Sequence, residues 1–388
     1  MTYVKNQSAA NPTAAGFISY NTARYFEKLP CLQPSEELPD ICVLINPLTI
    51  EINHDRNSFS LLGNAPEQFV KEIAKVVQLV DASSFIDNLN TSSTSSNFLD
   101  YFKVQLQETK FVDIVTRSQE YIRAGDIFQV VLANSFHTSL TPYPLTTYEL
   151  LKQTNPSPYH FCFQFPPYSY LGASPELMLH TSRPSISQVN AYMRPVAGTY
   201  PLTEAAMNEI ESALALKRDV KEQAEHIMLV DHCRNDLGRV SEIGTVRVTD
   251  LLSVETYPTL HHLVSGISGT LKQNLDSLDA LQACFPIATL TGTPKIRAME
   301  IIAELEAQSR GLFGGCQFRI YDDDTVDATV SIRAALLSPS GTLIQAGAGI
   351  VYDSNPQREF TECLLKAQPV CDAVVRAAAI EKTEVVIN

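Results

Sequence analysis

The sequence predicts an α+β fold of layered, largely antiparallel sheets that form a sandwich with helices outside. Three observations lead to this prediction. Strands and helices mix without the regular strand–helix–strand order of a parallel sheet. Many connections between the strand-like runs resemble hairpins. The chain of 388 residues, 45% of them hydrophobic, can also bury a substantial core, as one large domain or two.

The expected elements follow in chain order. Strand-like runs at 41–52 and 59–63 precede a connection rich in Ser, Thr and Asn at 81–100. We therefore expect a short N-terminal segment, 1–100, and a main domain, 101–388. Helical spacing predicts helices at 111–126 (ended by Gly125), 204–233 and 295–306, and from 356 onward. The remaining strands are expected at 127–136, 159–165, 168–180, 245–257, 260–271, 314–321, 328–337 and 342–351.

Composition excludes several classes of function. A net charge of −14 argues against binding to nucleic acid, although a few local cations still permit an anionic small molecule. No apolar run reaches the roughly 18 residues that a membrane span needs, and the N-terminus has no hydrophobic signal core. Eight cysteines without a C-x-x-C pair indicate reduced thiols. We expect a cytoplasmic protein with neither membrane nor nucleic acid as a partner.

Two predicted helices each carry a pair of glutamates. Glu359, Glu362 and Lys366 share one face of the last helix, and Glu222 and Glu225 stand three residues apart in an earlier one. Such spacing is typical of a solvated face with a salt bridge. It also suits a Mg²⁺ site, because hard cations take oxygen ligands and the two helices would then face each other across the ion. Both interpretations remain open at this point.

Three single residues are candidates for catalysis. Glu176 follows Ser-Pro at a strand edge, and a carboxyl group in an apolar setting has a raised pKa that suits a general acid. An isolated glutamate is more often a surface residue. His262 alternates with apolar strand positions, which is typical of an inward side chain and more often of a core residue than a catalyst. Cys316 has no activating neighbour in sequence, so we expect it to be buried.

Two further motifs could bind an anion. Gly347 and Gly349 let the backbone approach a ligand, and their successive N–H groups could form an anion-binding nest, although G-x-G is common in turns. Thr289, Thr291 and Lys295 gather two hydroxyls and a cation at a helix start, where an ordinary N-cap is the alternative.

Long motifs in this chain resemble the chorismate-utilising enzymes, and among them the large subunits (component I) of anthranilate synthases. The resemblance runs in family order from about residue 101 to the end. The motifs include "IRAGDIFQVVLANSF", "GASPELML", "RPVAGTYP", "KEQAEHIMLVDHCRNDLGRV", "TLTGTPKIRAMEIIAELE" and "QAGAGIVYDSNPQREF". A weaker echo, "GFISYNTARYFEKLP", lies at 16–30.

The resemblance implies a metal and substrate site. Mg²⁺ would lie between Glu225 and Glu362, with Glu222 and Glu359 supporting it through water. The cation would hold the ring carboxylate of chorismate. The other residues implied in binding chorismate are Gly198, Thr199, Arg333, Gly347, Gly349, Lys366 and Phe313. Arginine suits a bidentate carboxylate.

The resemblance also implies the chemistry. Glu176 would protonate the departing 4-hydroxyl while ammonia attacks C2, and His262 would help the later loss of pyruvate; Thr289 and Gln129 complete the catalytic set. Relatives that add water carry a lysine base where this chain has Gln129, and a neutral amide cannot deprotonate water. The implied reaction is therefore the Mg²⁺-dependent conversion of chorismate and ammonia to anthranilate and pyruvate, the first step of the tryptophan branch.

Two alternatives stay open. One is C4 amination in the folate route by an aminodeoxychorismate synthase component I, although Ala197 stands where that enzyme often has a lysine. The other is an inactive homologue that only binds chorismate or a partner. The shorter N-terminal segment and Phe313, in place of the usual tyrosine, motivate this reading. The lost hydroxyl removes a hydrogen bond worth about 0.5–1.5 kcal/mol.

The resemblance further implies a partner subunit. The chain has no G-x-C-x-G glutaminase elbow. Use of glutamine would therefore require a separate glutamine amidotransferase subunit, anthranilate synthase component II. A Leu-Leu-Glu-Ser motif of the tryptophan pocket is also missing. We expect weak or absent feedback inhibition by tryptophan.

Overall fold

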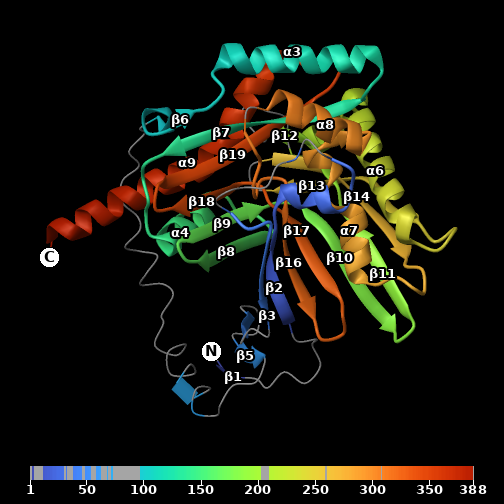
Figure 1. Ribbon diagram of the computed structural model, residues 1–388, viewed down its shortest axis with the longest axis horizontal. Helices are drawn as coiled ribbons and strands as arrows, with labels where there is room; N and C mark the ends of the chain where they lie inside the picture. The colour runs from blue at the N-terminus through green and yellow to red at the C-terminus, as the bar shows by residue number, and fades with distance from the viewer. Residues whose placement is uncertain are drawn as a thin grey trace.

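The computed structural model describes residues 2–3, 12–29, 32, 38–45, 49–53, 58–62, 68, 71–72, 97–201, 209–257, 260–306 and 308–387. Figure 1 shows two large sheets with helices on their outer sides. Every pairing within these two sheets is antiparallel. The predicted α+β class, with layered antiparallel sheets and outer helices, is confirmed.

The larger sheet has nine strands, with β13 paired to β14 beside the main order. That order is β12 (Val196–Pro201), β14 (Leu260–Thr270), β11 (Gln188–Met193), β10 (Leu177–Ser185), β17 (Val326–Val330), β16 (Cys316–Tyr321), β2 (Pro12–Ile18) and β3 (Ile41–Ile45). Strand β13 covers Arg247–Tyr257. Strand β2 therefore makes the N-terminal segment part of this sheet.

The second sheet has seven strands, with β6 (Lys103–Val104) paired to β7 beside the main order. That order is β15 (Gly292–Thr293), β7 (Gln129–Thr138), β19 (Gly341–Ile350), β18 (Ala334–Ser338), β9 (Tyr168–Ser174) and β8 (Tyr159–Phe165). A separate small sheet joins β1 (Thr2–Tyr3), β5 (Ser58–Leu62) and β4 (Thr49–Asn53).

Helices cover the outer faces of the two large sheets. Helices α6 (Val220–Val240) and α7 (Ser277–Cys284) pack on the nine-stranded sheet, and α4 (Pro144–Thr154) and α9 (Pro356–Ile387) on the seven-stranded one. Helices α3 (Glu108–Ala124) and α8 (Lys295–Leu305) cover β7. The α3 helix ends as predicted at Gly125, whose φ of 82° suits a residue without a Cβ. Phe17 of β2 contacts Phe163, Phe165 and Tyr170, and so joins the sheets.

Two expected strands are each broken where the chain crosses from one sheet to the other. Strand β9 ends at Ser174 and β10 begins at Leu177, so Pro175 and Glu176 form one corner. Likewise β17 ends at Val330 and β18 begins at Ala334, and Arg333 in that corner has a φ of 51°. The corners are bonded to each other, because the Val330 amide donates to the Glu176 carbonyl (3.1 Å). The sequence patterns predicted one continuous strand at 168–180 and another at 328–337, because the residues on both sides of each corner are apolar.

The expected helix at 204–233 is instead two helices, α5 (Glu209–Arg218) and α6. Asp219 separates them and caps α6, since its side chain accepts from the amides of Lys221 and Glu222. Residues 204–208 and most of the expected connection at 81–100 lie outside the described residues.

Among the described residues, no helix is long and apolar enough to cross a membrane. The described cysteines carry free thiols, and Cys316 is fully buried as expected.

Candidate active site

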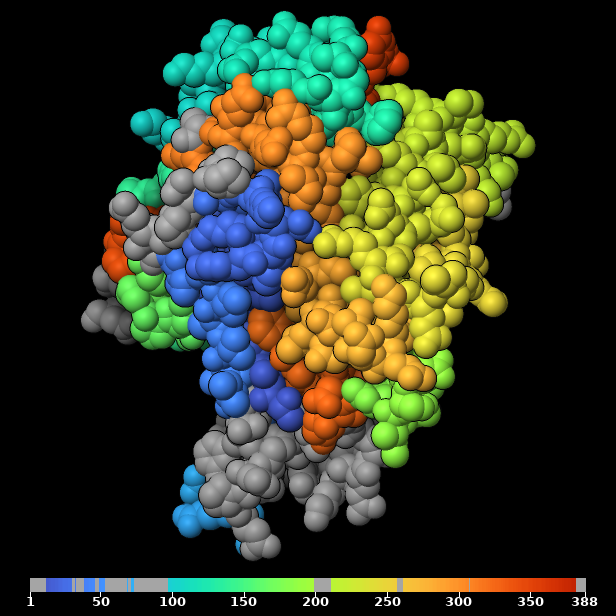
Figure 2. All heavy atoms as spheres, turned by 45° about the vertical axis from the view of Figure 1, so that its right-hand side comes forward, coloured from blue at the N-terminus to red at the C-terminus, as the bar shows by residue number. Residues whose placement is uncertain are grey.

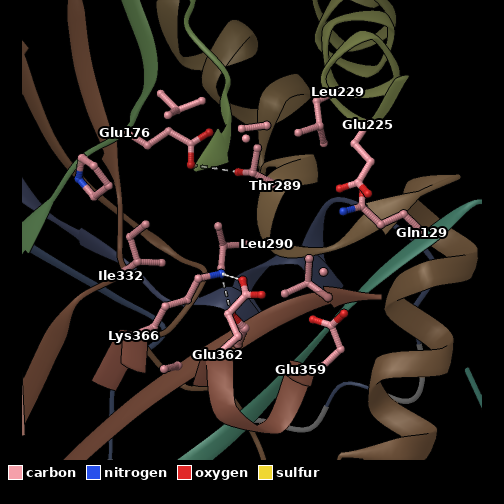
Figure 3. Close-up of a pocket in the computed structure, with 18 of the residues that line it drawn as sticks. Gln129, Glu176, Glu225, Leu229, Thr289, Leu290, Ile332, Glu359, Glu362 and Lys366 are labelled. Atoms are coloured by element: carbon pink, nitrogen blue, oxygen red, sulfur yellow. Dashed lines mark hydrogen bonds and ion pairs between the residues drawn. The ribbon is translucent and has the colours of Figure 1, made fainter. Parts of the chain in front are cut away.

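A cavity of about 540 Å³ opens between the two sheets and the helices α6 and α9. It is lined by every residue that the family resemblance implies for the site except Thr199. Thr199 lies in β12 opposite His262, and its side chain is outside the described part of the structure. Figure 3 shows Glu225 pointing into the cavity from α6 on one side, and Glu359 and Glu362 from α9 on the other. The two acidic helices, more than a hundred residues apart, therefore meet at one site.

Glu176 lies in the corner between β9 and β10 and is only 3% exposed. Its Oε2 accepts a hydrogen bond of 3.0 Å from Thr289, which lies in the 3₁₀ helix η3 (Ala288–Leu290) (Figure 3). Burial raises the pKa of Glu176 to about 8, against the opposing effects of Thr289 and Lys366. A carboxyl group with this pKa is mostly protonated at neutral pH and can donate a proton.

Arg333 and Lys366 are cations that face the same cavity. Burial lowers the pKa of Arg333, but a guanidinium remains charged in proteins. Within the described ranges, its side chain makes no hydrogen bond or ion pair with the protein. Lys366 pairs with Glu362 (2.6 Å) and donates to the carbonyl of Gly347 (3.1 Å). The salt bridge expected from helical spacing is therefore present, but it faces a cavity instead of bulk water.

The four glutamates crowd negative charge into this cavity. Burial raises the pKa of Glu222, Glu225 and Glu359, and neighbouring carboxylates add to each rise. The nearest cation to Glu225 is Lys221, whose Nζ lies 3.5 Å from Oε1. Within the described residues, no group of three acidic, histidine or cysteine side chains is arranged to hold a metal ion. The donor chemistry nevertheless fits a hard divalent cation, because half-buried carboxylate oxygens that repel one another are stabilised by a cation.

His262 points inward from β14, as its strand pattern indicated. Its Nδ1 lies 3.1 Å from the carbonyl of Gly198. Since a carbonyl only accepts, Nδ1 carries the proton and the lone pair is on Nε2. Burial lowers the pKa of His262 and so favours the neutral ring. Gly198 itself has a φ of 67°, and a Cβ there would lie 3.1 Å from Oε2 of Glu222.

The two glycines expected to approach a ligand both line the cavity. Gly347 and Gly349 lie in β19, opposite Ala133 and Val131 of β7. They also leave space for a neighbouring side chain. A Cβ at Gly349 would lie 2.7 Å from Nε2 of Gln129, which shows that the Gln129 amide packs directly on this glycine.

The structure does not bring Thr289, Thr291 and Lys295 together in one anion site. Only Thr289 faces the cavity. Thr291 is buried and donates to the carbonyl of Ile287 (3.1 Å), and the Lys295 ammonium is buried against Asp236 (2.8 Å). The helix start therefore uses its polar groups for internal bonds.

Sequence reasoning missed several residues of the site. Lys221 and Ser354 line the cavity, and the Ser354 hydroxyl lowers the pKa of Glu359 against the effect of burial. Leu290, Ile332 and Val131 form apolar walls. No local sequence pattern distinguishes these residues, because each belongs to a common residue type. They reach the cavity only through the way the sheets and helices pack.

Comparison with known proteins identifies the family of this chain. A sequence model of a family described as chorismate binding enzymes matches residues 1–372. The chain is 37% identical to anthranilate synthase component 1 of Streptomyces coelicolor, over 94% of this chain and 73% of that protein. It is 36% identical to the protein of that name from Thermus thermophilus, over 94% of this chain and 78% of that protein.

A solved structure gives the same result. The crystal structure of anthranilate synthase component I from Streptococcus pneumoniae superposes with a TM-score of 0.77 at 31% identity, covering 95% of this chain and 83% of that one. Matches of this length and identity leave no doubt about kinship. The chain belongs to the family of chorismate binding enzymes.

Proposed function

We propose that this protein converts chorismate and ammonia to anthranilate and pyruvate, with Mg²⁺ as cofactor. The observation that carries the proposal is the position of Glu176, a buried acid with a pKa of about 8. It faces a cavity that also holds Arg333, Lys366 and four carboxylates. Similarity to proteins named anthranilate synthase component 1 supports the choice of product.

The cavity suits a small dianion. The Arg333 side chain makes no hydrogen bond or ion pair with the described residues, and a guanidinium binds a carboxylate through two parallel hydrogen bonds. We assign it the enolpyruvyl carboxylate. The ring carboxylate then points toward α6 and α9, where Lys366 and the backbone of Gly198 lie. Mg²⁺ bound by Glu225 and Glu362, with Glu222 and Glu359 behind them, would neutralise the repulsion between that carboxylate and the four glutamates.

Glu176 and His262 then carry the proton transfers. Ammonia attacks C2 with its lone pair, the ring double bonds shift, and the 4-hydroxyl leaves as water with the proton of Glu176. The added nitrogen is positively charged after the attack, and one of its protons returns to Glu176 through solvent. Neutral His262, with its lone pair on Nε2, accepts the proton lost from C2 as the C3–O bond breaks. It then passes that proton to the methylene carbon of the departing enolpyruvate, which becomes pyruvate. The products are anthranilate, pyruvate and water, so atoms balance.

Gln129 favours ammonia over water as the nucleophile. The amide is neutral at every pH of interest, so it cannot deprotonate water, whereas free ammonia needs no base. Gln129 lies against Gly349 on the cavity wall, in a position to accept a hydrogen bond from the incoming nitrogen.

We propose a glutamine amidotransferase subunit as the partner that would supply nitrogen from glutamine, because these 388 residues contain no G-x-C-x-G glutaminase elbow. We expect the pure chain to use ammonium salts but not glutamine.

The test is turnover of chorismate by the purified chain with ammonium and Mg²⁺, with the product identified by mass and fluorescence. We expect anthranilate and an equal amount of pyruvate, and a loss of about 10²–10⁴-fold in Glu176→Gln. A 4-aminated product that retains the enolpyruvyl group would instead assign the C4 reaction. Binding of chorismate without turnover would identify an inactive homologue.

A further inference from the structure

An ion pair lies directly beneath the cavity. Arg310 is 2% exposed and its Nε donates to Oε2 of Glu306 (2.9 Å), while Nη2 donates to the other carboxylate oxygen. Glu306 also accepts from the amide of Ala133 (2.8 Å) in β7. Neither residue lines the catalytic cavity. Burial of a charge pair costs desolvation free energy, which only good geometry and further hydrogen bonds offset. The bonds of this pair to its surroundings therefore need an explanation.

The guanidinium connects three walls of the cavity. Its Nη2 donates to the carbonyl of Val131 in β7 (2.6 Å), and its Nη1 donates to the carbonyl of Leu290 in η3. Its Cζ lies 5.6 Å from the ring centroid of Phe313. Val131, Leu290 and Phe313 all line the cavity. One side chain therefore fixes the relative positions of a strand, a 3₁₀ helix and an aromatic wall.

We propose that Arg310, held by Glu306, is a positioning residue that places η3 so that Thr289 can bond Glu176. Thr289 immediately precedes Leu290 in a helix of only three residues, so a bond to the Leu290 carbonyl restrains the Thr289 side chain. This inference rests on the proposed role of Glu176 as the acid. It adds a requirement for Arg310, which does not touch the cavity.

The N-terminal segment takes part in the same arrangement. The Tyr20 ring lies 4.8 Å from Cζ of Arg310, and the Tyr20 amide donates to the carbonyl of Gly311 (2.8 Å). Figure 2 shows the blue N-terminal residues beside the orange residues around position 300. The guanidinium is thus packed between Tyr20 and Phe313, and a planar group fits this gap better than an ammonium does.

Other groups that act on Glu176 lie on different elements and stay in place when Arg310 is changed. The backbone hydrogen bond from Val196 in β12 and the charge of Lys366 on α9 lower the pKa of Glu176, and the thiol of Cys233 on α6 is a buried, uncharged neighbour. A change in the titration of Glu176 after substitution of Arg310 therefore reports on Thr289 and η3.

The decisive variant is Arg310→Lys, which keeps the charge beside Glu306 but cannot bond the carboxylate and two backbone carbonyls in one plane. The readout is the titration of Glu176, followed by ¹³C NMR of protein labelled at the glutamate carboxyl carbon and assigned with Glu176→Gln. We expect the Glu176 pKa to rise by about 0.4–1 unit in Arg310→Lys, because a hydrogen bond to the ionised form is lost. Thr289→Val should give a similar rise, and the double variant no further rise.

Controls separate positioning from folding. Arg297→Lys is the matched control, since Arg297 lies in α8 and pairs at the surface with Asp126 and Glu300; it should leave the titration unchanged. If Arg310→Lys does not fold, the pair Arg310→Met with Glu306→Leu removes both charges together and gives the same readout. A folded Arg310 variant with wild-type titration of Glu176 would overturn the inference.

Kinetics add a second readout. In Arg310→Lys we expect kcat to fall about 10-fold while KM for chorismate changes less, because the acid is displaced but the cations that bind substrate are not. If the wild-type protein fails to turn over chorismate, that result contradicts the proposed function but not the positioning role of Arg310. The NMR titration tests the positioning role and needs no turnover.

Discussion

The hydroxyl of Thr289 donates a hydrogen bond of 3.0 Å to Glu176, although 113 residues separate them in the chain. One comes from a 3₁₀ helix beside the seven-stranded sheet, and the other from the corner where the chain passes between the sheets. This bond favours the ionised carboxyl and so opposes the larger effect of burial. The balance leaves an acid whose pKa, about 8, lies close to neutral pH.

Replacing Glu176 by Gln should change how stability depends on pH. The pKa of Glu176 is about 8 in the folded protein and about 4.3 in an unfolded chain. A raised folded pKa means that stability is fully present below about pH 4.3 and is lost as pH rises toward 8. At about 1.4 kcal/mol per unit, the loss amounts to a few kcal/mol.

Urea unfolding near pH 5 and near pH 8.5 checks this prediction. Relative to wild type, Glu176→Gln should become progressively more stable as pH rises. A stability difference that is the same at both pH values would show that Glu176 is not buried as an acid.

Replacing Glu225 by Gln should have opposite effects with and without Mg²⁺. Without the metal, the variant should melt at a higher temperature, because one of several half-buried, mutually repelling carboxylates is gone. With Mg²⁺, the stabilisation that bound metal gives should shrink, because a ligand is lost. Thermal unfolding across a Mg²⁺ titration measures both effects, and Glu304→Gln, at an exposed position of α8, is the control. Equal metal-dependent stabilisation in the Glu225 variant and wild type would rule out this site.

Replacing Gly349 by Ala should lower activity while costing little stability. The new Cβ would lie 2.7 Å from Nε2 of Gln129, the end of a flexible side chain that can move away. We expect at least about a 10-fold loss of kcat/KM for ammonia, since a displacement of about 1 Å in a catalytic group has effects of this size or larger.

Gly238→Ala is the matched control. Gly238 lies exposed inside α6, and a Cβ there meets no atom within 4 Å. This variant should keep full activity and gain about 0.5–1 kcal/mol of stability, because alanine is the better helix former. Wild-type activity in Gly349→Ala would mean that the position of Gln129 is unimportant.

Replacing Arg333 by Gly should weaken chorismate binding without destabilising the fold. The residue has a φ of 51°, which glycine adopts at no cost but other residues adopt at about 1–2 kcal/mol. Loss of charged hydrogen bonds, worth about 1.5–3 kcal/mol, should raise KM for chorismate roughly 10–100-fold. Calorimetric titration with chorismate checks this. Unchanged affinity would remove Arg333 from the site.

The local elements follow from sequence patterns to a large extent. The helices α3, α8 and α9 and most strands lie close to where the patterns placed them, because burial of one face imposes a regular spacing of apolar residues. The residue types of the site were also visible, and the resemblance of long motifs pointed to the family. The patterns did not predict the corners between β9 and β10 and between β17 and β18. Apolar residues continue through each corner, so each pair of strands was predicted as one continuous strand.

The sequence by itself determined which chemical groups this protein carries, since two glutamate pairs, a lysine and an arginine are present whatever the fold. Only the tertiary structure decided that these groups meet in one cavity, that Glu176 is buried beside Thr289, and that Arg310 supports them from beneath. The physical reason is that contacts and burial between residues over a hundred positions apart depend on how two sheets pack, and no periodic pattern in the chain records that packing.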